Sequence, residues 1–280
     1  MGPGQEKVIG LIAGKGQFPL IFARAARNRG LKVVAVAHKD ETDPALEELT
    51  DQTTWVRVGQ LGALIKAFKS AGVTRAVMCG GLTKTRMFRD VRPDLTALKL
   101  LPRLRHLGDD ALLRALAEFL KDQGVEIVAS HHLLPELLAR PGAYTRRRLT
   151  TAEREDARWG WKVAGALGKL DVGQCVVVKN KVVVAVEALE GTDATIRRAG
   201  ELAGKGTVVV KRCKPGQDER FDMPAVGPET IKVMASAGAG ALVVEAGRTL
   251  VFNREEMNRL AEKAGIAIEA WEGQGDGTSD

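Results

Sequence analysis

The feature that most constrains the fold is the alternation of short apolar runs with helical stretches. In the first half, apolar runs occupy residues 8–13, 31–37, 53–58, 76–79 and 125–128, with helices predicted up to Gly30, over 61–71 and over 109–123. Strands that are almost continuously apolar and alternate with helices are typical of a parallel sheet covered on both faces. The first half therefore predicts a Rossmann-like α/β domain.

The second half begins with a helix and then changes to a mixed pattern. A helix is expected over 151–167, and valine-rich strands at 176–178 and 182–186 flank a short turn with Asn180, which favours a hairpin. Further strands are predicted at 207–211, 241–245 and 266–271, and helices at 192–202, 228–235 and 254–264, with Thr192 as a candidate N-cap.

This pattern predicts an α/β protein with two domains. We expect a Rossmann-like N-terminal domain with a parallel sheet over 1–148, and a C-terminal α/β catalytic domain with a mixed sheet over 149–272. Residues 273–280, rich in glycine and polar side chains, are expected to form a disordered tail.

Composition narrows the class of protein. Hydrophobic residues make up 45% of the 280 and charged residues 28%, the balance of a globular chain, and no apolar run approaches the ~18 residues of a membrane span. Cys79, Cys175 and Cys213 are widely spaced without a CxxC pair, which favours reduced thiols over a zinc site. We therefore expect a cytoplasmic protein, at most peripheral to a membrane.

Charge is distributed unevenly along the chain. Residues 1–150 hold 24 Lys and Arg against 15 Asp and Glu, a net of +9, whereas residues 151–280 hold 18 against 20, a net of −2. An excess of positive charge indicates an anionic partner: nucleic acid, an anionic membrane or a phosphorylated small molecule. The aromatic content of 4% argues against base-stacking platforms and hence against nucleic acid.

The segment from Lys84 to Arg105 combines seven basic residues with leucines. The leucines of this leucine-basic region and just beyond it are Leu95, Leu98, Leu100, Leu101, Leu104 and Leu107. It is either a solvated basic face packed on the sheet or a surface for lipid, because leucines can enter the acyl layer while Lys and Arg pair with phosphates.

Two glycine pairs follow predicted parallel strands. Gly14 and Gly16 come after the first strand, and Gly80 and Gly81 after the fourth. Because the carboxyl ends of parallel strands share one edge, where ligands bind, these turns are candidates to hold a phosphate on backbone amides. Ordinary tight turns remain the alternative. The second strand ends at His38 rather than at an acidic residue, which disfavours a nicotinamide cofactor.

A polar cluster in the second half is the densest candidate site. It comprises Glu187, Glu190 to Asp193 and the segment from Lys211 to Pro224. Carboxylates suit Mg²⁺, which keeps much of its coordination for water and substrate phosphates, and neighbouring Lys and Arg suit the phosphates themselves. A solvated surface loop is the alternative.

Several of these segments together resemble the LpxI-type UDP-2,3-diacylglucosamine pyrophosphatases of lipid A biosynthesis. The specific stretches are EGTD at 190–193 and KPGQDERFDMP at 214–224; GLIAGKG at 10–16, Gly80-Gly81, GDD at 108–110 and Gly173-Gln174 support them. The resemblance spans about residues 7–271, and Lys15 stands where the family often has glycine.

The resemblance implies Mg²⁺-dependent hydrolysis of UDP-2,3-diacylglucosamine to UMP and 2,3-diacylglucosamine 1-phosphate. Asp222 matches the family's acidic catalytic position, as base or metal ligand, with Asp218 a second candidate metal ligand. The candidate substrate-binding residues are Gly14, Gly16, Gly80, Gly81, Gln174, Thr192, Asp193, Lys211, Lys214 and Arg220. Expected partners are this substrate and the inner-membrane surface, but not nucleic acid, and a homodimer is compatible with the sequence.

Two other functions remain open on the residues alone. A nucleotide-sugar transferase or oxidoreductase could use the same Rossmann-like scaffold. A non-catalytic binder of anionic membranes or nucleic acid would account for the basic first half, but it has no use for the acidic cluster at 217–222.

Overall fold

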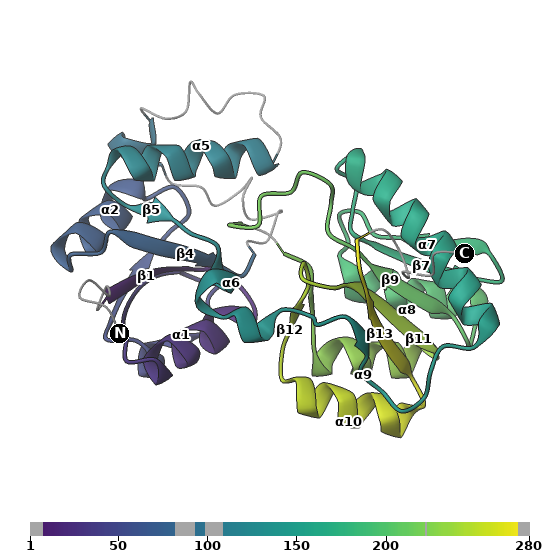
Figure 1. Cartoon of the computed structure of the whole chain (residues 1–280). Helices are drawn as coiled ribbons and strands as arrows, with labels where there is room; N and C mark the ends of the chain where they lie inside the picture. The colour runs from purple at the N-terminus through teal and green to yellow at the C-terminus, as the bar shows by residue number, and fades with distance from the viewer. Residues whose placement is uncertain (1–7, 82–92, 99–108, 222, 274–280) are drawn as a thin grey trace. The chain divides into compact units, whose positions relative to one another are not determined.

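The structure, a computed structural model, describes residues 8–81, 93–98, 109–221 and 223–273 (Figure 1). The chain divides into an N-terminal unit, Met1–Pro135 with Asp218–Phe221, and a C-terminal unit, Glu136–Gln217 with Asp222–Asp280. The sequence pattern predicts a domain boundary at 148/149. Residues 136–148 lie with the second unit because the short strand Gly142–Ala143 pairs with its sheet.

The N-terminal unit alternates strands and helices as predicted. Its strands are β1 (Val8–Ala13), β2 (Lys32–His38), β3 (Gln52–Val56), β4 (Arg75–Cys79) and β5 (Glu126–Ile127). Its helices are α1 (Phe18–Asn28), α2 (Leu61–Ser70), α5 (Asp109–Asp122) and the short α6 (Ser130–Leu133), with a 3₁₀ turn η1 at Pro44–Leu49.

The five strands form one parallel sheet in the order β3-β2-β1-β4-β5, which confirms the Rossmann-like prediction. Helix α1 lies on one face, and α2 and α5 lie on the other (Figure 1). On the α2 and α5 face, Phe68 and Leu120 are fully buried against Val36 and Ala76. The near-continuous apolar character of the strands follows from this coverage of both faces.

The C-terminal unit contains the mixed sheet that was expected. Its strands are β6 (Gly142–Ala143), β7 (Cys175–Lys179), β8 (Val182–Val186), β9 (Val208–Lys211), β10 (Ala225–Val226), β11 (Ala241–Glu245), β12 (Leu250–Val251) and β13 (Ala267–Trp271). Its helices are α7 (Thr151–Lys169), α8 (Thr192–Ala203), α9 (Pro228–Ala237) and α10 (Arg254–Ala264), and the 3₁₀ turn η2 covers Pro135–Leu137.

Six of these strands form a sheet in the order β6-β13-β11-β9-β7-β8. Strands β9, β11 and β13 are parallel, whereas β7 pairs antiparallel with β9 and β8, as a hairpin requires. The two-residue strands β10 and β12, which the sequence did not predict, form a separate parallel pair.

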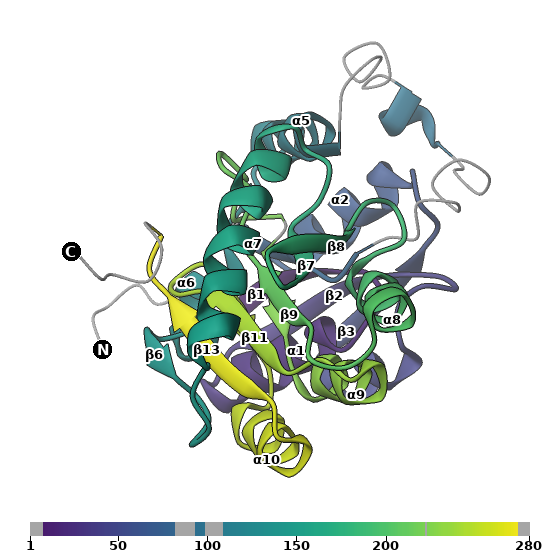
Figure 2. The same cartoon turned by 90° about the vertical axis from the view of Figure 1, so that its right-hand side faces the viewer.

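Side chains along each strand of this sheet alternate between two cores. Val208 and Val210 of β9 pack against α7, while Val209 between them packs with α8, α9 and α10. This period of two sets the architecture, in which α7 crosses one face and the other three helices cover the opposite face (Figure 2).

Three further expectations can be compared with the described residues. All three cysteines are buried and none is in a disulfide, as predicted for small apolar side chains. No helix in the described ranges is long and apolar enough to cross a membrane. Of the leucine-basic region, only residues 93–98 are described; Leu95 and Leu98 are exposed, whereas Leu100, Leu101, Leu104 and Leu107 lie outside the described residues, as does the tail at 274–280.

Candidate functional site

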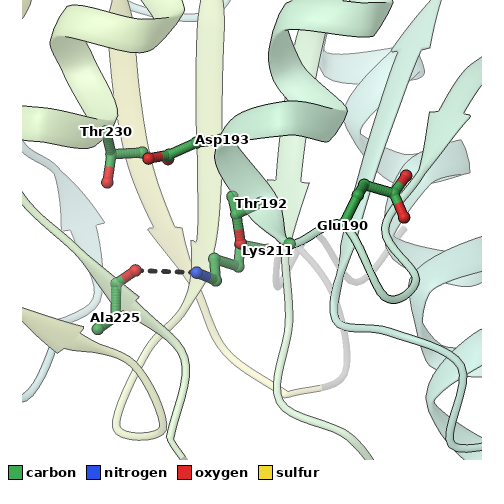
Figure 3. Close-up of a pocket in the computed structure, with 7 residues that line it drawn as sticks. Glu190, Thr192, Asp193, Lys211, Ala225 and Thr230 are labelled. Atoms are coloured by element: carbon green, nitrogen blue, oxygen red, sulfur yellow. Dashed lines mark hydrogen bonds between the residues drawn. The ribbon is translucent and has the colours of Figure 1, made fainter. Parts of the chain in front are cut away.

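The C-terminal unit contains an open pocket of about 310 Å³ at the carboxyl end of β9 (Figure 3). Its lining residues are Glu190, Gly191, Thr192, Asp193, Lys211, Ala225 and Thr230. Three of the predicted substrate-binding residues, Thr192, Asp193 and Lys211, are thus brought together by the fold.

The ends of three elements position the polar side chains of this pocket. Lys211 is the last residue of β9, Thr192 and Asp193 open α8, and Thr230 lies in the first turn of α9. Figure 3 shows Asp193 pointing towards Thr230. Amides at a helix start and a strand-end cation both favour an anion at such a place.

The start of α8 differs from the prediction that Thr192 is its N-cap. Gly191 takes this position with φ of +83°, a conformation that favours glycine, and no side chain caps the helix there. The Thr192 hydroxyl instead donates to Oε1 of Glu187 at 2.9 Å. Glu187 is itself buried, so it fixes the Thr192 side chain at the pocket wall.

Lys211 is the most informative residue of the pocket. Its side chain is 7% exposed, and its Nζ donates to the Ala225 carbonyl oxygen at 3.0 Å (Figure 3). Among the described residues, no carboxylate forms an ion pair with it. An ammonium group carries three donors, and a buried charge is costly unless it is paired, so this pocket is suited to an anionic ligand.

The acidic side chains around the pocket are engaged differently. Glu190 pairs with Arg198 at 2.6 Å, and in Figure 3 its carboxylate points away from Lys211. Nearby, burial and the Glu187 carboxylate raise the pKa of the Cys175 thiol. Cys175 is therefore protonated near neutrality and unsuited to nucleophilic chemistry.

The structure places Gln174 and Lys214 away from the pocket lining. The Gln174 carbonyl oxygen accepts from the Arg212 amide at 2.9 Å, and its side-chain Oε1 is buried without a hydrogen-bond partner among the described residues. Lys214 pairs with Asp171 at 2.7 Å. Their assignment to substrate binding stays a prediction.

The predicted glycine turns of the N-terminal unit meet at one sheet edge. The Gly14 amide donates to the Cys79 carbonyl oxygen at 2.8 Å, and the Lys15 amide donates to the Gly81 carbonyl oxygen at 2.7 Å. A Cβ at Gly14 would lie 2.4 Å from the Gly81 oxygen, and one at Gly80 would lie 2.4 Å from the Lys15 oxygen. A side chain at Gly14 or Gly80 would therefore clash with the backbone of the facing turn, so both positions require glycine.

Gly16 and Gly81 are different from their neighbours. A Cβ at either position would meet nothing within 4 Å, so no described protein group accounts for the absence of a side chain there. Gly16 does adopt φ of +97°, which itself favours glycine. Packing or backbone conformation therefore explains the glycines at positions 14, 16 and 80, but neither explains the glycine at position 81.

The segment Asp218–Phe221 belongs to the N-terminal unit, and Arg220 forms a two-point ion pair with Asp218. The Arg220 Nε and Nη2 donate to the two Asp218 oxygens at 2.9 and 2.7 Å, and Arg114 Nε lies 3.7 Å from Oδ2. The hydrogen bonds from Arg220 hold the pKa of Asp218 below its usual range.

Both oxygens of Asp218 accept hydrogen bonds from Arg220, so Asp218 is engaged in an ion pair here, and its role as a magnesium ligand stays a prediction. No group of three or more His, Cys, Asp or Glu side chains in the described ranges could hold a metal ion. Asp222, the other predicted metal ligand and the predicted catalytic residue, lies outside the described residues.

Two pocket residues, Thr230 and Ala225, are not among the residues predicted from the sequence. Thr230 accepts from the Gly227 amide through its hydroxyl at 3.3 Å, and its position six residues after the KPGQDERFDMP stretch was a usable signal. Ala225 contributes a backbone carbonyl, which no residue pattern can identify.

The fold and pocket define a two-domain α/β protein with an anion-suited site at the edge of its mixed sheet. The LpxI N-terminal and C-terminal domain models match residues 8–137 and 140–269. A curated relative, the UDP-2,3-diacylglucosamine pyrophosphatase LpxI of Caulobacter vibrioides, is 33% identical over 271 residues, covering 93% of this chain and 96% of its own. The chain belongs to the LpxI family, which confirms the resemblance drawn from the sequence.

Similarity to solved structures is low. The biotin carboxylase domain of a thermophilic 2-oxoglutarate carboxylase gives a TM-score of 0.27 at 14% identity, over 70% of this chain and 33% of that chain. A biotin carboxylase from Campylobacter jejuni gives 0.25 at 15% identity, over 71% and 42% respectively. The chain spans less than half of either structure, and likeness of this size carries no argument about fold or function.

Proposed function

We propose that this protein hydrolyses the diphosphate of UDP-2,3-diacylglucosamine, releasing UMP and 2,3-diacylglucosamine 1-phosphate. Membership of the LpxI family and the name of the curated relative support the substrate and the reaction. The observation in the chain itself that carries the proposal is the buried Lys211 ammonium, which lines a pocket and lacks a carboxylate partner among the described residues.

The chemistry requires charge neutralisation, because a diphosphate carries negative charge that repels an attacking oxygen. A preformed cation at the phosphate stabilises the charge that develops as the phosphoanhydride bond breaks. We assign this role to Lys211, and we assign contacts with substrate hydroxyls to Thr192, Asp193 and Thr230. The Thr192 hydroxyl donates its hydrogen bond to Glu187, so its lone pairs are free to accept from a substrate hydroxyl, and with the amides at the start of α8 it would orient the substrate without reorganisation.

Asp222 is proposed as the catalytic carboxylate on the strength of its place in the KPGQDERFDMP motif. It would accept the proton of the attacking water, or bind a metal ion. We also propose Mg²⁺ dependence; when bound, the ion would neutralise phosphate charge as a Lewis acid. Asp222 and Asp218 are the predicted ligands from the motif, and because Asp218 is already paired with Arg220, we propose Asp222 as the main one.

The direct test is an assay of the purified protein with UDP-2,3-diacylglucosamine and Mg²⁺, with no acceptor and no nicotinamide. We expect UMP to be released in step with 2,3-diacylglucosamine 1-phosphate, and EDTA to stop the reaction. Turnover that needs an added acceptor would support a transferase instead. Turnover that continues in EDTA would exclude the proposed dependence on a divalent ion.

A substitution at Lys211 tests the observation that carries the proposal. We expect Lys211→Met to raise KM for the substrate at least about tenfold, since a charge-assisted contact contributes roughly 1.5–3 kcal/mol. Its thermal stability should be kept, because the change removes a buried charge without a carboxylate partner. KM from steady-state kinetics and Tm from calorimetry give the two readings.

Lys179→Met is the matched control for this experiment. Lys179 ends β7, at the opposite edge of the same sheet, and its Nζ also donates to a backbone carbonyl, that of Ala203 at 2.6 Å. We expect this variant to keep the wild-type KM. If Lys211→Met also keeps it, Lys211 does not contact the substrate.

A further inference from the structure

His38, the last residue of β2, is held against the neighbouring strand by a small network. Its Nδ1 lies 2.9 Å from the Ala13 carbonyl oxygen at the end of β1. The Thr42 hydroxyl donates to the same oxygen at 2.6 Å and accepts from the His38 amide at 3.0 Å. The ring is therefore fixed beside the residue that precedes the Gly14 to Gly16 turn.

This contact determines which ring nitrogen carries the proton. A carbonyl oxygen only accepts, so Nδ1 must be the donor. Burial lowers the pKa of His38, so the imidazole is neutral near pH 7. Its Nε2 then has a lone pair and no proton, and no described residue donates a hydrogen bond to it. Such an atom can accept from a hydroxyl or imide donor, but it repels a phosphate oxygen.

The position of His38 in the sheet indicates which chemical group would donate a hydrogen bond to its Nε2. The strand order β3-β2-β1-β4-β5 reverses direction at β1, and ligands of such sheets bind at the carboxyl edge there. In dinucleotide folds the residue that accepts from the ribose hydroxyls ends the second strand, roughly 20 residues after the glycine turn. His38 ends the second strand at about this distance from Gly16.

A neutral acceptor at this position suits a nucleotide whose ribose is attached to a diphosphate. The usual acidic residue would add a negative charge near the phosphates, whereas imidazole accepts the same hydrogen bond without charge. We propose that His38 is a specificity-determining residue whose Nε2 accepts a hydrogen bond from a ribose hydroxyl of the nucleotide. This inference rests on the proposed function, which supplies a uridine nucleotide as half of the substrate.

A purely structural role must be separated from this one, because His38 also satisfies the Ala13 carbonyl. His38→Asn makes the separation: a side-chain amide can replace the Nδ1–H donor, but it has nothing at the position of Nε2. Thr42→Val is the matched control, since it removes the other hydrogen bond to Ala13, together with the acceptor of the His38 amide, and keeps the imidazole.

The experiment measures binding of UMP, 2′-deoxy-UMP and 3′-deoxy-UMP to the full chain by calorimetry. We expect the wild type to bind one of the deoxy nucleotides about 3- to 10-fold more weakly than UMP, the size of one neutral hydrogen bond. His38→Asn should bind UMP more weakly than the wild type by that same factor, and it should bind UMP and the deoxy nucleotide with equal affinity. Thr42→Val should keep the wild-type preference, even if its Tm falls.

The proposal is overturned if the wild type binds all three nucleotides equally or binds none. It is also overturned if His38→Asn discriminates as the wild type does. The comparison of UMP with the two deoxy nucleotides uses the wild-type protein, so it tests the proposal even if a variant does not fold. UMP release from the substrate is measured separately, so a protein that hydrolyses it without discriminating hydroxyls refutes only the role of His38.

Discussion

The role of a charged residue in this protein depends on which groups its side chain is paired with. Asp218 illustrates this point, because its carboxylate, a predicted metal ligand, is paired with Arg220 and lies near Arg114. Lys211 is the opposite case, since its buried ammonium has only a carbonyl oxygen as a partner among the described residues. A paired charge stabilises the fold, whereas an unpaired one is available to a ligand.

The Asp218 ion pair predicts a pH-dependent contribution to stability. Its pKa is lowered in the folded protein, so its contribution is complete above the unfolded value of about 3.9 and is lost as pH falls through the folded value. We expect Asp218→Asn to lower the free energy of unfolding by about 1 kcal/mol at pH 7. In urea titrations this difference should shrink as pH is lowered from 5 to 3.

Glu256→Gln is the control for this prediction. Glu256 forms the same two-point pair with Arg259, at 2.7 and 2.8 Å, but on an exposed helix surface, and should change unfolding little at any pH. Asp218→Asn should also leave the Mg²⁺ concentration for half-maximal activity unchanged. A large rise in that concentration would mean that Asp218 binds the metal after all.

At the scale of the elements, tight contacts between neighbouring turns determine which substitutions are tolerated. We expect Gly14→Ala to lower Tm by several degrees, because its Cβ would lie 2.4 Å from the Gly81 oxygen of the facing turn. At Gly81, an added Cβ meets no atom of the described residues within 4 Å, so Gly81→Ala should keep Tm. If Gly81 contacts the nucleotide, as its place at the sheet edge predicts, this variant should lose activity while staying folded.

These two variants are compared by calorimetry and by UMP release. A wild-type Tm for Gly14→Ala would show that the two turns can move apart. A Gly81→Ala variant with wild-type kcat and KM would remove Gly81 from the candidate substrate-binding residues.

The β7–β8 hairpin depends on a carboxylate from a different element. Asn180 and Lys181 both adopt positive φ at the turn, and their amides donate to the buried Asp156 of α7 at 2.9 and 2.6 Å. Asp156→Ala leaves both amides without this acceptor, and we expect a loss of about 2–4 kcal/mol in urea unfolding. Asp156→Asn retains one acceptor oxygen and should lose less. Equal stability of both variants with the wild type would contradict this account.

For the whole molecule, the distribution of charge predicts an interaction with membranes. The first 150 residues carry a net charge of +9, and Leu95 and Leu98 of the leucine-basic region are exposed. A substrate with acyl chains favours association with a lipid surface, where basic residues contribute about 1 kcal/mol each. We predict binding to anionic liposomes that weakens as salt is raised from 50 to about 300 mM.

Co-sedimentation with liposomes of anionic and of neutral lipid measures this binding. Leu95→Ser with Leu98→Ser should weaken it, and Leu170→Ser, an exposed leucine of the C-terminal unit, is the control that should not. Failure of the wild type to bind anionic liposomes at low salt would refute peripheral association.

The sequence by itself determined the order of the elements, the parallel and mixed sheets and the family. These follow from local causes: apolar runs of strand length predict strands, and the EGTD and KPGQDERFDMP motifs are specific enough to identify a relative. The partners of Thr192, Lys211 and Asp218 could not be obtained in this way. Glu187 and Arg220 are near Thr192 and Asp218 in the sequence, but each is one of several polar neighbours, and the partner of Lys211 is a backbone carbonyl.

Only the tertiary structure decided which residues meet. The pocket draws Lys211 from β9, Thr192 and Asp193 from α8, and Thr230 from α9, so its composition depends on how strands and helices pack. The same holds for Asp218–Phe221, which lies with the N-terminal unit although the chain on either side of it lies with the C-terminal unit. Hydrophobic periodicity is local and can be read along the chain, whereas the pairing of buried charges depends on contacts between residues that only folding brings together.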